Sequence, residues 1–255
     1  MKRIASFVYG VGCYAIFFCT FLYAIGFLGN IAVPRSIDSA PAGPLWESAL
    51  IDALLLGLFA LQHSIMARNW FKAWWTRFVP APVERSTYVL FSSLAMILMF
   101  WQWRPLGGVI WDVANPTGRG LLTGMFLAGF LIVLVTTFLI NHFDLFGLRQ
   151  VWLYLRGRQY TALGFQTPGP YRLVRHPLYI GWMCAFWAAP TMTAGRLIFA
   201  VTTTAYILVA IYFEERDLMR DHAEYREYRR RVPMLVPGLA RGAAGEAADR
   251  QPSAA

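Results

Sequence analysis

Charged side chains are scarce in this sequence. Only 15% of its 255 residues are Asp, Glu, Lys or Arg, and 57% are hydrophobic. A soluble domain normally carries about 25% charged residues. The apolar residues gather in long runs, and a run of roughly 20 is needed to cross the bilayer core. The low charge therefore argues against a soluble protein and predicts an all-α integral membrane protein, because lipid offers a spanning backbone no hydrogen-bond partner.

Cysteine and histidine are also few. The three cysteines lie within apolar segments, which argues against a disulfide framework or a cysteine metal site. The four histidines show no His-x-x-x-His spacing, so we expect no bound metal. Gly10-Val11-Gly12 and Gly118-Arg119-Gly120 lack the third glycine of a dinucleotide-binding loop. These absences exclude the common metal and dinucleotide sites that sequence spacing can reveal.

Long apolar runs fill most of the first 140 residues. We expect membrane spans at about 4–33, 45–66, 86–103 and 120–140. Lys2 and Arg3 lead straight into the first run without an Ala-x-Ala cleavage site, so this run is expected to remain as a span. The segment 67–85 mixes three tryptophans with Lys and Arg, which is typical of chain at the lipid headgroup level.

The second half begins with a long polar connection at 141–177, a length that is usually functional or disordered. Two shorter apolar segments follow, at 178–189 and 197–213, and we expect a tight helix–helix turn at 190–196. The first segment is short for a full crossing. We therefore expect five to six transmembrane helices, the last two forming a helical hairpin.

A charged amphipathic helix on the cytoplasmic side is expected at 214–231, where Arg and Glu are frequent. The Ala- and Gly-rich tail, 238–255, is expected to be disordered. We assign residues 1–237 to one membrane-embedded domain, with the cofactor-binding part at about 141–232.

The distribution of basic residues predicts the orientation of the chain. With a cytoplasmic N-terminus and six segments, 19 of the 23 Lys and Arg residues fall in regions assigned to the cytoplasm. Such an excess of positive charge marks cytoplasmic loops. We therefore expect both termini, the long connection and the C-terminal helix on the cytoplasmic side.

The densest cluster of unusual residues surrounds Arg175-His176-Pro177. Pro177 suits the first turn of a helix, where its missing N–H costs nothing. The unpaired N–H groups of that turn, together with Arg175 and His176, could bind a carboxylate or phosphate. Gly181, one turn later, would let a ligand approach the backbone. An ordinary helix start with basic anchors at the membrane surface explains the same pattern.

A second cluster contains the adjacent carboxylates Glu214 and Glu215, where the last apolar segment meets water. If the last two segments form a hairpin, these acids and the Arg175-His176 pair meet at one membrane face. A positive and a negative group facing each other suit a zwitterionic ligand. Alternatively, this is a solvated helix whose acids pair with Arg216 and Arg220.

Further polar residues lie near the ends of spans, notably His63, His142 and Asp144. Polar groups at membrane depth are costly and are functional candidates. Near the ends of spans this argument weakens, because long side chains reach back toward water.

The stretch from Gly169 to Glu215 resembles the isoprenylcysteine carboxyl methyltransferase-like membrane methyltransferases. The resemblance is carried by Gly169-Pro170-Tyr171, Arg175-His176-Pro177-Leu178-Tyr179-Ile180-Gly181 and Glu214-Glu215. A closer match, over roughly residues 1–237, is to the bacterial methanethiol S-methyltransferases. It is carried by residues 61–68, 82–88, 100–105 and 139–151, the second being Pro82-Val83-Glu84-Arg85-Ser86-Thr87-Tyr88.

This resemblance implies an enzyme that uses S-adenosylmethionine to methylate a small thiol, methanethiol to dimethyl sulfide. It also implies a cofactor pocket between the final hairpin and the preceding loop. The residues expected to bind the cofactor are Tyr171, Arg175, His176, Tyr179, Gly181, Glu214 and Glu215. Because thiolate is the reactive form of a thiol, His63, His142 and Asp144 are candidate bases. Alternatively, the positive charge of the cofactor and simple positioning are sufficient.

Two other functions remain open from sequence. One is a lipid or prenylcysteine methyltransferase of the same superfamily, and the other is a non-catalytic or haem-binding membrane protein. The expected partners are the small thiol and the lipid bilayer, without nucleic acid, and the oligomeric state is left open. The expected location is the bacterial inner membrane.

Overall fold

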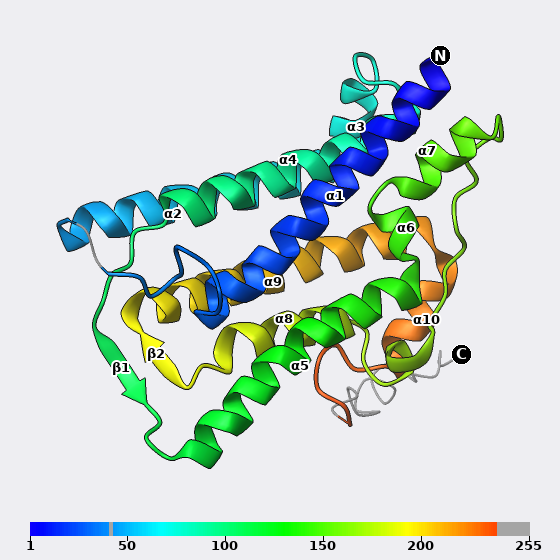
Figure 1. The fold of residues 1–255 in the computed structure, drawn as a ribbon. Helices are drawn as coiled ribbons and strands as arrows, with labels where there is room; N and C mark the ends of the chain where they lie inside the picture. The colour runs from blue at the N-terminus through cyan, green and yellow to red at the C-terminus, as the bar shows by residue number, and fades with distance from the viewer. Residues whose placement is uncertain (41–42, 239–255) are drawn as a thin grey trace, which may run out of the picture.

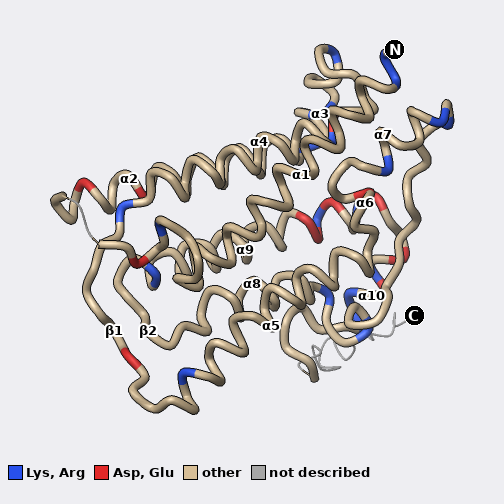
Figure 2. The backbone as a smooth tube through the Cα atoms, viewed as in Figure 1, with Lys and Arg blue, Asp and Glu red and all other residues tan. Residues whose placement is uncertain are grey.

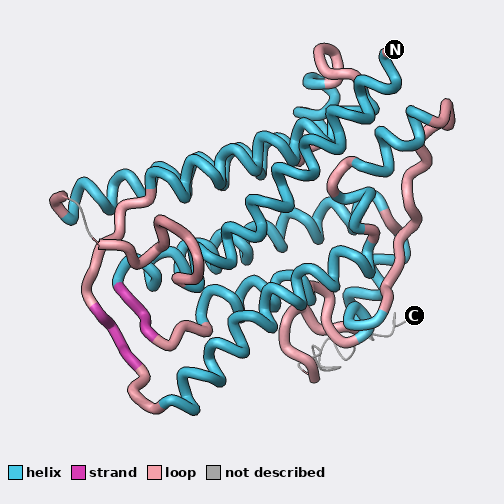
Figure 3. Tube along the Cα trace, viewed as in Figure 1, coloured by secondary structure: helices cyan, strands magenta, loops and turns pink. Residues whose placement is uncertain are grey.

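The computed structural model describes residues 1–40 and 43–238, and within them the chain is mostly helical (Figure 3). The tail expected to be disordered lies, from residue 239 onward, outside the described residues. Five helices are long and apolar enough to cross a membrane: α1 Lys2–Gly29, α2 Leu45–Met66, α4 Ala81–Gln102, α5 Pro116–Ile140 and α9 Ala194–Asp221. The all-α membrane fold expected from composition is thereby confirmed.

Helix α8, Pro177–Trp187, is the short apolar segment of the last hairpin. Its 11 residues extend about 16 Å, roughly half of a bilayer core. Figure 1 shows α2 and α4 along one side of the bundle, α5 and α8 along the other, and α1 and α9 between them. Helix α8 is therefore held within the bundle, chiefly against α5.

Two glycines let α5 and α8 approach each other closely. A Cβ atom added at Gly129 would lie 2.6 Å from the Ala185 nitrogen and 2.6 Å from the Gly181 carbonyl oxygen. One added at Gly181 would lie 2.8 Å from the Gly129 oxygen. Small residues at such crossings allow backbone-to-backbone packing within a membrane. The glycine expected to admit a ligand thus faces the α5 backbone.

The segment expected to form a tight turn at 190–196 contains a short strand. Strand β2, Thr191–Thr193, pairs antiparallel with β1, Val109–Asp112, in the connection before α5. The indole N–H of Trp111 also donates to the Ala189 carbonyl oxygen. The connection between α8 and α9 is thus short, as expected, but it contains a strand and is not a tight turn. The hydrogen-bond partners of this strand come from β1, which the residues of 190–196 alone do not reveal.

The boundary expected at residue 214 is also wrong. Helix α9 continues without a break through Glu214 to Asp221, since no glycine or proline interrupts it. The break occurs at His222, which has an extended backbone, and α10, Ala223–Arg231, follows. The two glutamates therefore belong to the membrane helix itself, and α10 folds back as a separate element.

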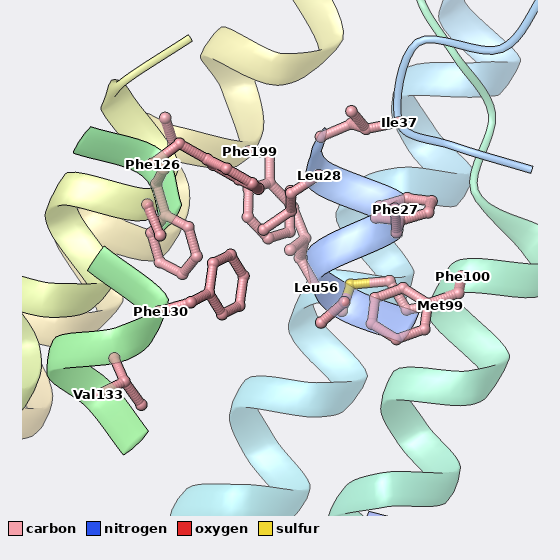
Figure 4. Close-up of a cluster of buried hydrophobic side chains, with 14 of the residues drawn as sticks. Phe27, Leu28, Ile37, Leu56, Met99, Phe100, Phe126, Phe130, Val133 and Phe199 are labelled. Atoms are coloured by element: carbon pink, nitrogen blue, oxygen red, sulfur yellow. The ribbon is translucent and has the colours of Figure 1, made fainter. Parts of the chain in front are cut away.

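An aromatic core joins the two sides of the bundle. Phe27 and Ala200 are fully buried, and Phe126 and Phe130 of α5 form an edge-to-face pair with ring centroids 5.2 Å apart. Figure 4 shows this cluster, with Phe27, Leu28, Ile37, Leu56, Met99, Phe100, Phe126, Phe130, Val133 and Phe199 labelled. Outward-facing leucines such as Leu54 and Leu131 are exposed, as expected for side chains that contact lipid.

The long connection after α5 is ordered into short helices. It contains α6 His142–Leu145, α7 Leu148–Leu155 and the 3₁₀ turn η1 Gly169–Arg172. Together with α10 and with α3, Asn69–Trp75, these elements lie at the end of the bundle that bears the N-terminus (Figure 1). Lys and Arg concentrate there (Figure 2), and we call it the charged end.

Candidate active site

A buried carboxylate organises the charged end. Glu215 on α9 has a side chain only 6% exposed. Its Oε1 accepts from Arg175 Nε at 2.7 Å and lies 3.0 Å from His176 Nε2, while its Oε2 lies 2.9 Å from Arg229 Nε of α10. The structure thus brings together the basic corner before α8 and the twin-glutamate corner of α9. Arg229, which sequence reasoning missed, completes the cluster.

Arg175 also holds the C-terminal segment in place. Its guanidinium donates to the carbonyl oxygens of Arg229 and Val232 at the end of α10. Its backbone N–H donates to Pro233 O at 2.9 Å, and that of His176 donates to Met234 O at 3.2 Å. The two amides just before α8 are therefore bonded to the residues after α10. In the first turn itself, where free N–H groups were expected, the Tyr179 N–H donates to the His176 carbonyl oxygen at 3.1 Å.

The two glutamates have different surroundings. The Glu214 side chain is 47% exposed, in contrast to the buried Glu215. Glu214 Oε2 accepts from the Tyr179 hydroxyl at 2.9 Å and lies 4.0 Å from His176 Nδ1. Since a carboxylate has capacity for several hydrogen bonds, Glu214 retains accepting capacity for a ligand, whereas Glu215 is surrounded by two arginines and a histidine.

Aromatic residues line the inner side of α10. The Tyr228 hydroxyl donates to the Tyr171 carbonyl oxygen at 2.6 Å, and Phe165 packs edge-on against Tyr225 and Tyr228. Burial raises the pKa of Tyr228 to about 12. The buried Tyr225 hydroxyl has no hydrogen-bond partner within the described residues. An orphaned buried hydroxyl of this kind is costly unless a ligand or water satisfies it.

His63 lies in a polar cluster between α2 and α4. Its Nδ1 is 3.0 Å from the Tyr88 hydroxyl and 3.3 Å from the Ser92 hydroxyl, and Nε2 is 3.1 Å from Tyr88. Phe59, one turn earlier, stacks on the ring at 5.3 Å. Sequence reasoning identified the histidine but not Tyr88, although Tyr88 ends one of the motifs that carry the resemblance.

The His63 cluster is connected toward the glutamate corner through α9. Ser64 and Tyr206 hydroxyls are 3.0 Å apart, and Arg68 pairs with Asp217 at 3.0 Å. Helix α9, which also carries Glu214, therefore contacts α2 at the residue next to His63 and again one turn later.

His142 is fully enclosed by three elements. Its Nε2 is 2.8 Å from the Tyr14 hydroxyl of α1, and its Nδ1 is 2.8 Å from the Thr137 hydroxyl of α5. Thr137 donates its own proton to Leu134 O, so it accepts from Nδ1–H. The imidazole therefore carries its proton on Nδ1 and accepts from Tyr14 at Nε2. Both nitrogens are bonded to protein, and Phe138 stacks on the ring at 4.1 Å.

Asp144 is bonded within its own connection. Its carboxylate accepts from Arg149 at 2.9 Å and from the Tyr160 hydroxyl at 3.3 Å. Arg149 also donates to the Thr161 carbonyl oxygen. These bonds tie the two ends of the 144–161 segment together. Of the three candidate bases, His63 is the one on α2, the helix that contacts α9 through Ser64–Tyr206 and Arg68–Asp217.

Burial lowers the pKa of the His142 imidazole below its ordinary value of 6.5. The unfolded chain therefore binds this proton more readily, and the free energy of unfolding should decrease as the pH falls below about 6.5. Thermal unfolding in detergent between about pH 8 and about pH 5 measures this. Other groups titrate in the same range, so we expect a shallower decrease in His142→Gln than in the wild type. Equal pH dependence of the two proteins would contradict this assignment.

Within the described residues, no group of three or more His, Cys, Asp or Glu side chains is arranged to hold a metal ion. The polar groups of the site instead form hydrogen bonds and ion pairs with one another. The arrangement offers one exposed carboxylate, a wall of aromatic rings and a histidine within the bundle.

The chain is similar to several known proteins, to some of them over nearly its whole length. It is 57% identical over 238 residues to a methanethiol S-methyltransferase of Crocosphaera subtropica, covering 93% of each chain. It is 54% identical to one of Mycobacterium tuberculosis, covering 93% of this chain and 98% of the relative. Nurim of Mus musculus is 30% identical over 66% of each chain. No family model matches the chain, and no solved structure matches it.

Proposed function

The chain belongs to the methanethiol S-methyltransferase family, and from this membership we propose that it methylates methanethiol to dimethyl sulfide. The observation that carries this proposal is the 57% identity that extends over 93% of both chains. Because most of the aligned residues belong to the membrane bundle, we expect the activity to reside in the bundle.

We propose S-adenosylmethionine as the methyl donor. When bound, it supplies an electrophilic methyl group on a sulfonium ion. The residues at the charged end fit such a molecule, since its ammonium and sulfonium groups are cations and Glu214 is an exposed carboxylate. We propose that the rings of Tyr171 and Tyr179 contact its cationic groups and that the unsatisfied Tyr225 hydroxyl donates to one of its polar groups.

The expected residues divide into two roles. Arg175, His176 and Glu215 are bonded to one another and to α10, so we assign them to the framework that shapes the pocket. Glu214 and Tyr179 are bonded to each other at its exposed edge, so we assign them to direct contact with the donor. Gly181 contributes through the close packing of α8 on α5.

Glu214→Gln should weaken binding of S-adenosylhomocysteine, the demethylated donor, because a charged hydrogen bond to the ammonium group becomes neutral. We expect a loss of about tenfold in affinity, about 1.4 kcal/mol. Calorimetry on the purified protein in detergent measures this. Glu227→Gln is the matched control, since Glu227 is an exposed glutamate paired with Arg231 on α10. Unchanged affinity in Glu214→Gln would remove Glu214 from the pocket.

The reaction itself can be tested with purified protein, methyl-labelled S-adenosylmethionine and methanethiol. We expect labelled dimethyl sulfide in the headspace, in amounts that depend on protein concentration. A parallel reaction with a lipid extract in place of the thiol addresses the lipid methyltransferase alternative. Label in the lipid phase, with none in the headspace, would overturn the proposed substrate.

We further propose that the charged end faces the cytoplasm of a bacterial inner membrane. The support is the charge asymmetry of the sequence and the concentration of Lys and Arg at this end (Figure 2). A periplasmic reporter enzyme fused after Pro237 should be inactive, and the same reporter inserted between β1 and α5 should be active. The reverse pattern would invert the orientation.

A further inference from the structure

The motif that ends in Arg85-Ser86-Thr87-Tyr88 has no role in the donor pocket. Its residues begin α4, and Arg85, Tyr88 and Ser92 lie three and four positions apart, which places them along one face of that helix. The structure turns this face toward His63 of α2. Arg85 also lies over the Tyr88 ring, with its Cζ 5.9 Å from the ring centroid. One tyrosine and one serine thus contact a single imidazole, and one arginine lies over the ring of that tyrosine.

The hydrogen bonds around His63 define which nitrogen can accept a proton. Ser92 donates its hydroxyl proton to the Tyr88 carbonyl oxygen at 3.0 Å, so its oxygen is an acceptor toward His63 Nδ1. This favours the tautomer with the proton on Nδ1 and leaves Nε2 as the basic nitrogen. The Tyr88 hydroxyl donates its proton to the His63 carbonyl oxygen at 3.4 Å and lies 3.0 Å from Nδ1, so it is a second acceptor toward Nδ1–H and leaves the Nε2 lone pair available. Tyr88 and Ser92 together therefore set both the orientation and the tautomer of the ring.

The polar cluster around His63 lies between two apolar helices. Placing a His–Tyr–Ser network between two apolar helices costs free energy, and apolar side chains would join the helices equally well. Such a network is therefore a candidate for a functional role. Ser64, the neighbour of His63, contacts Tyr206 of α9, and Glu214 lies about two turns further along the same helix. The charged and titratable groups that act on the cluster are Arg85 and Glu84 of α4 and Tyr206 of α9.

We propose that His63 is the proton acceptor for the thiol, that Tyr88 is the residue that positions its imidazole, and that Arg85 stabilises the thiolate. This inference rests on the proposed thiol methylation and specifies how its substrate is activated. The S–H bond breaks and its proton moves to Nε2 of His63. The electron pair left on sulfur forms the new S–C bond as the methyl carbon separates from the donor sulfur, which keeps the electron pair of that bond.

The pH dependence of turnover distinguishes this role from a structural one. His63→Ala should lower kcat/KM about 100-fold near neutral pH, the usual contribution of a general base. Tyr88→Phe should lower kcat/KM about tenfold, because the His63 imidazole is still present but is no longer held in place by the Tyr88 hydroxyl. Both defects should shrink as the pH rises into the alkaline range, where a growing fraction of the thiol ionises in solution without a base from the protein. A merely structural bond between α2 and α4 would produce a defect of constant size.

Two further variants test the remaining claims. Arg85→Lys keeps the positive charge and should retain most of the activity. Arg85→Gln should lower kcat/KM about tenfold, which corresponds to a rise of about one unit in the pKa of the bound thiol. Tyr9→Phe is the matched control for Tyr88→Phe. Its hydroxyl lies 3.0 Å from that of Thr87, the neighbour of Tyr88 on α4, but outside the His63 cluster. We expect Tyr9→Phe to have wild-type activity.

A spectroscopic measurement without donor or thiol provides an independent readout. In protein labelled with nitrogen-15 at histidine, the His63 signals are identified by their loss in His63→Gln. We expect the Nδ1–H tautomer in the wild type and in Tyr9→Phe, and a mixture of tautomers in Tyr88→Phe. An unchanged spectrum in Tyr88→Phe, or a pH-independent activity defect, would overturn the inference. Absence of dimethyl sulfide from the wild type at every pH would instead reject the proposed function.

Discussion

Glu215→Ala should destabilise the protein by about 3–5 kcal/mol, the usual cost of removing one partner from a buried ion pair. The change leaves Arg175 without its 2.7 Å acceptor and Arg229 without its 2.9 Å acceptor, in a site where the Arg175 side chain is only 10% exposed. Arg175 also holds the end of α10. We therefore expect α10 to detach from the corner at a lower temperature than the rest of the bundle unfolds.

The measurement is thermal unfolding in detergent, combined with limited proteolysis to report the release of α10. Glu214→Ala is the control, because this neighbouring glutamate is half-exposed and bonds only to Tyr179 among the hydrogen bonds of the described residues. We expect it to leave the unfolding midpoint nearly unchanged while weakening donor binding. If the two alanine variants unfold alike, Glu215 does not hold the charged end together.

Gly129→Ala is the second change with a large expected effect. A Cβ at this position would lie 2.6 Å from two backbone atoms of α8. Because both are backbone atoms, no side-chain rotation can remove the clash. Helices α5 and α8 must then separate, and overpacking of this kind costs about 1–3 kcal/mol or more. Because α8 carries Tyr179, we also expect the variant to lose affinity for S-adenosylhomocysteine.

Gly124→Ala provides a closely matched control. It places the same methyl group on the same helix, where nothing lies within 4 Å of the added atom. We expect no loss of stability there, since alanine is the better helix former by up to about 1 kcal/mol. Unfolding midpoints of the two variants in one detergent provide the comparison. A fall for Gly124→Ala as large as for Gly129→Ala would mean that α5 tolerates alanine poorly for reasons other than the α8 contact.

The two variants test different parts of one arrangement. Glu215 binds α10 at the charged end, whereas Gly129 allows α8 to pack closely against α5. The donor pocket we propose lies where these elements meet. A loss of donor affinity in Gly129→Ala without loss in Gly124→Ala would link the packing of apolar helices to the chemistry at their ends.

Sequence periodicity and composition predicted the spans well. The second span was expected at 45–66 and is found at Leu45–Met66, since the turn-rich stretch ending at Pro44 and the polar residues after Met66 mark both ends. The start of α8 at Pro177 was expected from the preference of proline for the first helical turn. Long apolar runs leave a chain in lipid few choices other than helix.

Contacts between distant segments were predicted less well. The strand at Thr191–Thr193 depends on a partner about 80 residues earlier, and the residues that surround His142 come from α1 and α5. Nothing in the local spacing of either segment identifies such partners. The two glutamates are likewise adjacent in sequence, and only their rotation of about 100° around α9 separates a buried residue from an exposed one.

The sequence alone predicted that this protein is a helical membrane protein and that its basic residues gather on one side. It also predicted that Arg175 and His176 meet the twin glutamates at one membrane face. These properties follow from composition and local pattern, which act on each segment separately. Only the tertiary structure decided that Glu215 is enclosed by cations, that Glu214 remains exposed, and that Tyr88 reaches His63. The physical reason is that helix rotation and helix contact select which side chains meet, and both are set by packing across the whole bundle.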